Sequence, residues 1–224
     1  MRASGRELRR EAEALLRAED FERRLPEWLR FPARRLIGPL LSFLCSADDL
    51  LRWRAVRVMG LVTSRLAGED PESARVVMRR LMWSLTDESG GIGWGAPEAM
   101  AETMVNHEGL ATEFAHILVS YVGANETRLD NDLLLRGVLW GLGRLGSARP
   151  DLLRDCLPHL EPFLRSGDAA LRGLAAWALA RMGALTPDRA RPLLDDEAEF
   201  DLYLDGVLAT RRIRDVAALP GGSP

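Results

Sequence analysis

Apolar residues recur along most of the chain at intervals of three and four positions, the spacing of one face of an α-helix. The first helix is expected to begin at Ser4, because Ser4 and Glu7 have the spacing of a capping box. From Pro32 onward, a helix of about 12–15 residues, a short polar turn and a second helix follow one another repeatedly. The pattern predicts four helix pairs: 32–45 with 48–66, 71–86 with 96–106, 108–122 with 131–146, and 150–165 with 168–183.

The last two pairs share a stretch of sequence. Residues 140–146 (WGLGRLG) match residues 177–183 (WALARMG) at an offset of 37, and residues 135–137 match residues 171–173 at an offset of 36. Residues 51–60 are a weaker copy. This offset is too long for a coiled-coil heptad and fits a two-helix unit of an α-solenoid.

These segments resemble the HEAT repeat family, in the short bacterial form also found in phycobilin-lyase-like proteins. The resemblance covers about 150 residues, from 32 to 183. It implies an all-α, right-handed α-solenoid of about four helix pairs. It carries little information about activity, because such repeats serve binding, scaffolding and occasional lyase roles.

Part of the resemblance is an aspartate in the turn before the second helix, followed by an arginine in the first turn of that helix. The carboxylate is expected to cap the helix and to pair with the arginine. The matching residues are Asp49 with Arg52, Asp132 with Arg136, and Asp168 with Arg172.

The C-terminal segment has a different pattern. Apolar and polar residues alternate on both sides of Asp205-Gly206, which predicts a β-hairpin at about 199–213 packed on the last helices. A short helix at 213–218 follows, and one continuous helix from Asp195 to Ala218 is the alternative. The expected organisation is an N-terminal helical cap (1–31), an α-solenoid (32–194), a hairpin and short helix (195–218) and a disordered tail (219–224).

Charge is unevenly distributed. All 30 basic residues are arginine, the net charge is -3 and the pI is about 5.7, which argues against a specific nucleic-acid binder. No arginine occurs between Arg80 and Arg128. This interval holds seven acidic residues: Asp87, Glu88, Glu98, Glu102, Glu108, Glu113 and Glu126.

The second helix pair is interrupted by a glycine-rich loop inside this arginine-free interval. Four glycines fall between residues 90 and 95, and Pro97 starts the next helix. A phosphate site is disfavoured because the loop lacks basic residues and the P-loop ending. Two interpretations stay open: a site for a cation or basic peptide, with aromatic walls, or a rigid turn with buried tryptophans. The first uses the carboxylates of Asp87, Glu88, Glu98 and Glu102 with Trp83 and Trp94.

We therefore expect a protein-interaction or scaffold module, with its partner on the second pair and the adjacent second helices. The partner is a protein, and a basic segment in it would suit the carboxylates. Glu98 and Glu102 lie one turn apart, so a solvated helix face is the alternative for this pair. The predicted binding residues are Trp83, Asp87, Glu88, Trp94, Glu98, Glu102, His107, Arg136 and Trp140.

The alternative function is a lyase-like or other enzyme acting on a small molecule. It requires an enclosed pocket near residues 87–107, lined by Asp87, Glu88 and His107. The three histidines lack metal-binding spacing, and neither a metal nor a cofactor is expected.

The chain is expected to be cytoplasmic, with neither a secretory signal nor a membrane-spanning segment, because no run approaches about 18 apolar residues. Cys45 and Cys156 are expected to be reduced and buried in helices.

Overall fold

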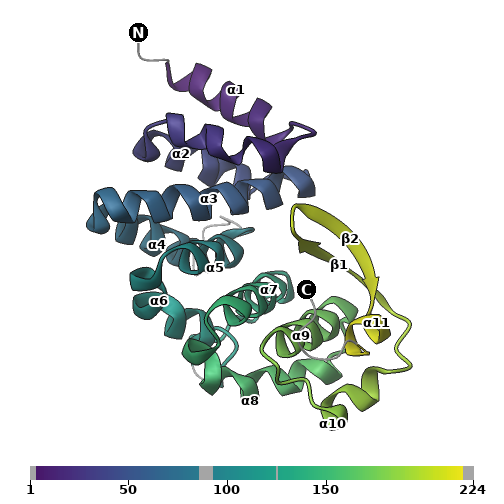
Figure 1. The fold of residues 1–224 in the computed structure, drawn as a ribbon. Helices are drawn as coiled ribbons and strands as arrows, with labels where there is room; N and C mark the ends of the chain where they lie inside the picture. Colours follow the sequence, from purple (N-terminus) through teal and green to yellow (C-terminus); the bar gives the residue numbers. More distant parts are fainter. Residues whose placement is uncertain (1–3, 86–92, 125, 219–224) are drawn as a thin grey trace. The chain divides into compact units, whose positions relative to one another are not determined.

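The computed structural model describes residues 4–85, 93–124 and 126–218, which form helices and one two-stranded sheet (Figure 1). Contacts divide the chain into two compact units, residues 1–107 and residues 108–224. Each unit is described by itself. The predicted disorder of residues 219–224 concerns a segment outside the described residues.

The unit of residues 1–107 is helical in its described part. Its α-helices α2 to α5 confirm the first two predicted pairs, because α2 packs on α3, α4 packs on α5, and α3 packs on both α4 and α5. The elements are α1 (Gly5–Leu16), the 3-10 helix η1 (Phe21–Arg30), α2 (Ala33–Leu44), α3 (Asp49–Glu69), α4 (Pro71–Leu85) and α5 (Ala96–Asn106).

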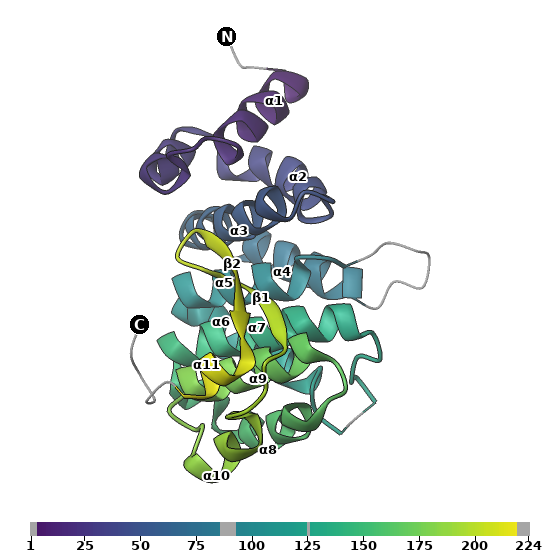
Figure 2. The ribbon, with the colours of Figure 1, turned by 90° about the vertical axis from the view of Figure 1, so that its right-hand side faces the viewer.

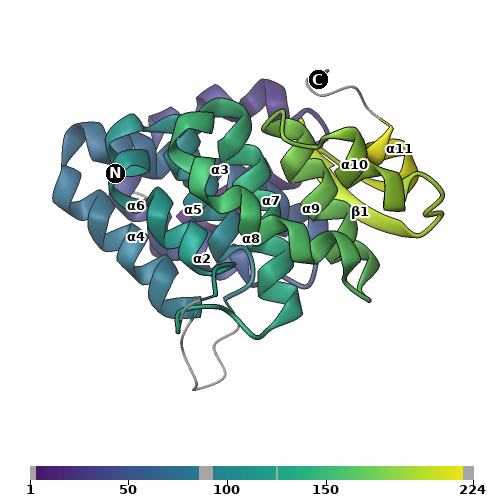
Figure 3. The same cartoon turned by 90° about the horizontal axis from the view of Figure 1, so that it is seen from below.

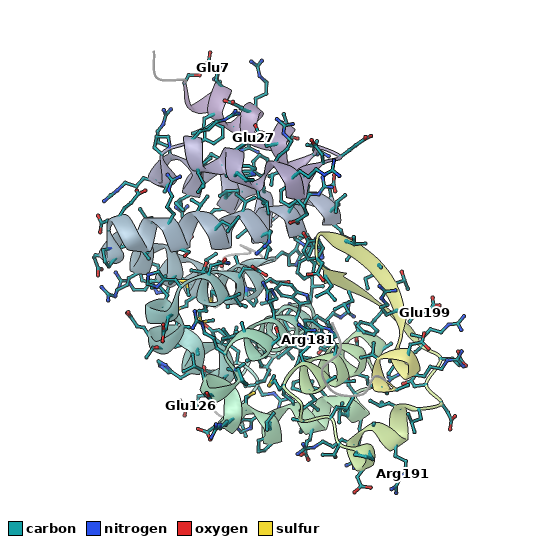
Figure 4. All side chains as sticks on the ribbon, in the orientation of Figure 1. Glu7, Glu27, Glu126, Arg181, Arg191 and Glu199 are labelled. Atoms are coloured by element: carbon teal, nitrogen blue, oxygen red, sulfur yellow. The ribbon has the colours of Figure 1, made fainter. Side chains whose placement is uncertain are left out.

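Helix α1 begins with the predicted capping box. The hydroxyl of Ser4 accepts a hydrogen bond from the amide of Glu7, and the amide of Ser4 donates to the Glu7 carboxylate. These two bonds satisfy amides that have no partner inside the helix. Glu7 lies at the beginning of α1, on the solvent side (Figure 4).

The unit of residues 108–224 contains the last two helix pairs and the sheet. Helices α7 and α9 lie side by side when the molecule is viewed from below (Figure 3). Its elements are α6 (Glu108–Ser120), α7 (Asp132–Ala148), η2 (Pro150–Cys156), α8 (Leu157–Leu160), η3 (Glu161–Arg165), α9 (Ala169–Arg181), α10 (Pro187–Ala190), η4 (Arg191–Leu193), β1 (Glu199–Leu204), β2 (Val207–Arg212) and α11 (Ile213–Ala217).

The segment 150–165 is not the single helix that the pattern predicted. It is divided into η2, α8 and η3. Pro158 and Pro162 explain the division, because each proline lacks the amide that a continuous α-helical ladder needs and its ring crowds the preceding turn.

The repeated sequence motif corresponds to equivalent positions of α7 and α9. The rings of Trp140 and Trp177 stack with centroids 6.4 Å apart and an interplanar angle of 16°. A Cβ atom at Gly143 would lie 2.4 Å from the Trp177 ring, so only glycine permits this approach. The 37-residue offset therefore reflects successive repeats packed against each other.

The C-terminal hairpin is confirmed. Strands β1 and β2 are antiparallel, from the pair Glu199–Arg212 to the pair Leu204–Val207. Asp205 and Gly206 both have positive φ, at 50° and 83°, as a two-residue hairpin turn requires. Strand β1 and helix α11 pack on α9, as Figure 2 shows, so the alternative of a continuous helix is wrong.

Helix caps depart from the expected aspartates in two of three cases. Asp168 caps α9 by accepting a hydrogen bond from a first-turn amide, as predicted. At α3 the cap is Asp48, and at α7 it is Asn131. The predicted residues Asp49 and Asp132 are instead the first residues of these helices, where their charges still complement the helix dipole.

The two cysteines have different environments and form no disulfide with each other. Cys156 is buried as predicted, and burial raises the pKa of its thiol to about 12. The prediction for Cys45 is wrong, because α2 ends at Leu44 and Cys45 caps that helix in an exposed position.

Candidate interaction surface

The predicted binding residues occupy positions of very different exposure. Asp87 and Glu88 lie outside the described residues. The remaining seven are exposed (Trp83), half-buried (Trp94, His107 and Arg136) or buried (Glu98, Glu102 and Trp140). Arg136 and Trp140 belong to the unit of residues 108–224, so a surface that joins them to the second pair stays a prediction.

The two glycines at the described end of the glycine-rich loop, Gly93 and Gly95, lie where a larger residue would not fit. Gly95 precedes α5 with a left-handed backbone at φ 71°, and a Cβ atom there would lie 3.1 Å from the Leu44 carbonyl oxygen. A Cβ atom at Gly93 would lie 2.6 Å from the Ser84 carbonyl oxygen. These two glycines therefore allow close backbone approach between α2, α4 and the start of α5.

Glu98 lies in the first turn of α5 and is 9% exposed. Its Oε2 atom has no hydrogen-bond partner within the described part of the chain. Burial raises the pKa of this carboxyl to about 7, and the positive charge of Arg52 offsets only part of that effect. The interpretation of Glu98 and Glu102 as a solvated helix face is therefore wrong.

Glu102 is 3% exposed and forms an ion pair inside the first unit. Its Oε2 atom lies 3.1 Å from Nη1 of Arg57, and the Asn106 amide donates a 2.7 Å hydrogen bond to its main-chain oxygen. A Cβ atom at Gly60 would lie 2.7 Å from the Cβ atom of Glu102, so glycine allows α3 and α5 to meet here. Glu102 therefore joins α5 to α3.

Trp94 lies beside Arg52, whose guanidinium carbon is 6.0 Å from the centroid of the indole ring. The same arginine forms a 2.7 Å ion pair with Asp49. This arrangement is a cation–π contact at the beginning of α3. Trp94 thus has a charged partner within its own unit.

His107 is the C-terminal capping residue that follows α5, with an extended backbone. Among the residues that the structure describes, no group of three or more histidine, cysteine, aspartate or glutamate side chains could hold a metal ion. An enzymatic pocket lined by Asp87, Glu88 and His107 stays a prediction, because the first two residues lie outside the described part.

Arg136 links successive repeats through an aspartate. Its guanidinium pairs with Asp168, the residue that caps α9. Arg172, the equivalent residue one repeat later, pairs with Asp196 through a 2.8 Å contact from Nε to the carboxylate. Of the expected pairs, Asp49–Arg52 is present, whereas Arg136 and Arg172 pair with aspartates further along the chain instead of with Asp132 and Asp168.

Trp140 lies in the core of the second unit, with 2% of its surface exposed. Its indole N–H donates a 2.8 Å hydrogen bond to the carbonyl of Tyr203 in β1. It therefore positions the hairpin on α7, and its indole is covered by the protein itself.

The described acidic residues of the arginine-free interval differ in exposure. Glu98 and Glu102 are buried in the first unit. Glu108, Glu113 and Glu126 are exposed in the second unit, and Figure 4 labels Glu126 there. Burial therefore removes Glu98 and Glu102 from the set of exposed carboxylates that the arginine-free interval could offer to a partner.

The outward face of α4 carries large exposed apolar groups. Trp83 is 68% exposed and Val76 is 52% exposed. We call Val76, Arg79, Arg80 and Trp83 the α4 face, because spacings of three, four and seven residues bring them to one side of the helix. The opposite side consists of buried Ala74, Val77, Met78, Leu81 and Leu85.

The α4 face was only partly predicted. Trp83 was among the binding residues predicted from the sequence, whereas Val76, Arg79 and Arg80 were not. The signal was present, because Val76 and Trp83 are seven residues apart and fall outside the apolar stripe formed by the buried residues of α4.

The described helices and strands define a helical-repeat protein. Residues 132–182, from α7 to the end of α9, match the sequence model of the HEAT-like repeat family. This segment is therefore similar to a HEAT-like repeat, as the resemblance predicted. Among the described residues, no helix is long and apolar enough to span a membrane.

An uncharacterised protein of Archaeoglobus fulgidus is 29% identical to the chain over 182 residues, which cover 79% of this chain and 91% of that protein. Two crystal structures of engineered proteins are also similar. One is 18% identical with a TM-score of 0.45, covering 84% of each chain. The other is 17% identical with a TM-score of 0.49, covering 85% of this chain and 92% of that chain.

Proposed function

We propose that this chain is a protein-interaction module whose partner binds on the α4 face, with Trp83 at the centre of the contact. HEAT-like repeats generally serve protein–protein interaction, which supports the class of function. The observation that carries the location is the 68% exposure of the Trp83 side chain.

An exposed tryptophan is a strong candidate for a binding contact. An indole ring offers a large apolar area with few rotatable bonds, and tryptophan and arginine are the residues most enriched in binding hot spots. Trp83 has Arg79 and Arg80 one turn away on the same face. The proposed partner thus still binds the second helix pair, as expected from the sequence, but it contacts the outward face of α4.

A partner with a basic segment was the expectation from the arginine-free interval. Binding of such a segment would depend on the carboxylates of Asp87 and Glu88, since Glu98 is buried and Glu102 pairs with Arg57. We retain the basic segment as the alternative partner for the same helix pair, to be separated by experiment.

The proposal is tested with Trp83→Ala in the full chain. Proteins captured from a lysate of the source organism are quantified for the wild type, for Trp83→Ala and for Leu194→Ala, a control that truncates another exposed apolar residue (47% exposed). We expect at least one partner to be recovered about tenfold less with Trp83→Ala and equally with the control.

Equal recovery of every partner by the Trp83→Ala and wild-type proteins would show that the α4 face is not the binding surface. Asp87→Asn combined with Glu88→Gln provides the third arm. If that variant loses the partner while Trp83→Ala keeps it, the acidic residues after α4 are the binding site.

A further inference from the structure

We infer that the partner segment bound by the α4 face is acidic and carries apolar side chains. This inference rests on the proposed function, and it specifies the chemistry of the partner. Its evidence is the combination of exposed apolar groups and arginines on one side of α4.

The apolar part of the face has defined dimensions. Val76 and Trp83 are seven residues apart, about two helical turns or 10 Å along the axis. Both side chains are more than half exposed. A partner that covers both needs apolar side chains at two places along its length, as an amphipathic segment has.

The charges of α4 favour an acidic partner. The helix contains three arginines and one glutamate, Glu72. Glu72 is shared, because it forms an ion pair with Arg79 and lies 3.6 Å from Arg75. Three arginines and one glutamate give the residues of α4 a formal charge of +2.

Arg80 is the arginine of α4 best placed to meet a carboxylate of the partner. It is exposed, and it forms no ion pair with another described residue. It lies between Val76 and Trp83, at spacings of four and three residues, so a carboxylate beside the apolar contacts would meet it. A guanidinium can donate two parallel hydrogen bonds to one carboxylate, which gives the contact a defined geometry.

Other anionic partners fit this face less well. Nucleic-acid interfaces commonly neutralise about 6–10 phosphates, whereas α4 carries three arginines, two of them already paired with Glu72. Phosphates also offer no apolar group for Val76. An acidic protein segment satisfies both the charge and the apolar area.

The test is a selection of random 16-residue peptides displayed on phage, with the folded full chain as the target. Peptides that also bind Trp83→Ala are removed by counter-selection. We expect the remaining peptides to carry net negative charge and at least two large apolar residues. The affinities of three such peptides are then measured by fluorescence anisotropy.

Arg80→Glu is expected to weaken these peptides at least tenfold, because an attraction becomes a repulsion. The matched control is Arg154→Glu, which reverses another exposed arginine in the second unit and should change affinity less than twofold. Circular dichroism confirms that both variants are folded. A peptide whose acidic residues are replaced with lysine should bind the Arg80→Glu variant more tightly than it binds the wild-type protein.

The outcomes separate this inference from the proposed function. Peptides that depend on Trp83 but are basic or uncharged would overturn the acidic partner and leave the α4 face as the binding surface. A failure to obtain any Trp83-dependent peptide would overturn both. If no acidic peptide is selected, but phosphatidylserine vesicles or DNA bind the wild type and not Trp83→Ala, the ligand of the α4 face is one of these anions and not a protein segment.

Discussion

Helices α5 and α9 are the second helices of their pairs, but they begin in different ways. Asp168 caps α9 and also pairs with Arg136 of the preceding repeat. Helix α5 has no side-chain cap, and it begins after Gly95 in a left-handed conformation. One start is held by polar side chains, and the other depends on backbone shape and close packing.

The difference extends to the first turn. In α9 the polar groups are paired, whereas α5 buries the Glu98 carboxyl with no partner for Oε2 in the described structure. A buried unpaired acid lowers stability when it ionises. The regular repeat therefore gains stability at its turn, and the irregular pair loses some there. Departures of this kind are typical of regions constrained by something other than stability.

The largest expected effect is in the regular repeat. Trp140→Ala removes the stack on Trp177 and the hydrogen bond to β1, and it should lower the free energy of unfolding by about 3–5 kcal/mol. Urea denaturation followed by far-UV circular dichroism measures it. Trp83→Ala is the control and should cost about 0.5 kcal/mol or less, since Trp83 is exposed. Similar losses for both variants would contradict the contrast.

Glu98→Gln should stabilise the protein, with a pH dependence. Because the carboxyl pKa is raised from 4.5 to about 7, the unfolded state releases this proton at lower pH than the folded state does. The free energy of unfolding of the wild type therefore falls as pH rises from about 4.5 to 7. It then stays lower by about 3 kcal/mol, at about 1.4 kcal/mol for each tenfold change in proton affinity.

The glutamine does not titrate, so the variant should equal the wild type near pH 4 and exceed it above pH 7. Urea denaturation at pH 4.5, 6 and 8 measures this difference. Glu102→Gln is the matched control in the same helix. It should destabilise by about 1–3 kcal/mol at pH 8, because Arg57 loses its charged partner. A Glu98→Gln gain that is constant with pH would exclude the titration as its cause.

Asp168→Ala tests the polar start of α9. It removes a helix cap and an ion pair, and it should cost about 2 kcal/mol in thermal or urea unfolding. Asp168→Asn should cost less, because asparagine still caps the helix. Asp132→Ala is the control: Asn131 is the cap of α7, so a loss of about 0.5 kcal/mol or less is expected. A larger loss at Asp132 would reverse the assignment of the cap.

Gly95→Ala should have the smallest effect, about 1–2 kcal/mol. Alanine is strained at positive φ, and its Cβ atom would lie 3.1 Å from the Leu44 carbonyl oxygen. Gly183→Ala is a matched control in the other unit, because Gly183 has φ 67° and open space around the added atom. The difference between the two losses measures the contact with Leu44. Equal losses would show that the backbone conformation alone requires glycine.

Several features of the fold were predictable because they depend on neighbouring residues in the chain. The capping box of Ser4 and Glu7 and the turn at Asp205-Gly206 are local in this sense. Caps at Asp48 and Asn131 were missed by one residue, because the acidic or amide side chain before each helix has a second candidate next to it. The choice between adjacent candidates depends on where the helix begins.

Burial in the second pair could not be predicted from spacing. Helix α5 packs against both α3 and α4, so residues on all its sides are buried, from Ala96 to Met104. A helix covered on two sides shows no polar stripe to identify. Glu98 and Glu102 were assigned to a surface because carboxylates usually face water, and the neighbouring helices decided otherwise.

The sequence by itself determined the helix pairs, the 36–37-residue repeat and the hairpin, since each follows from periodicity or from the allowed backbone conformations of a few residues. Only the tertiary structure decided which polar and aromatic side chains reach the surface. Exposure depends on elements distant in sequence. Trp140 is covered by β1, 63 residues later, whereas Trp83 lies on a side of α4 that leaves it 68% exposed.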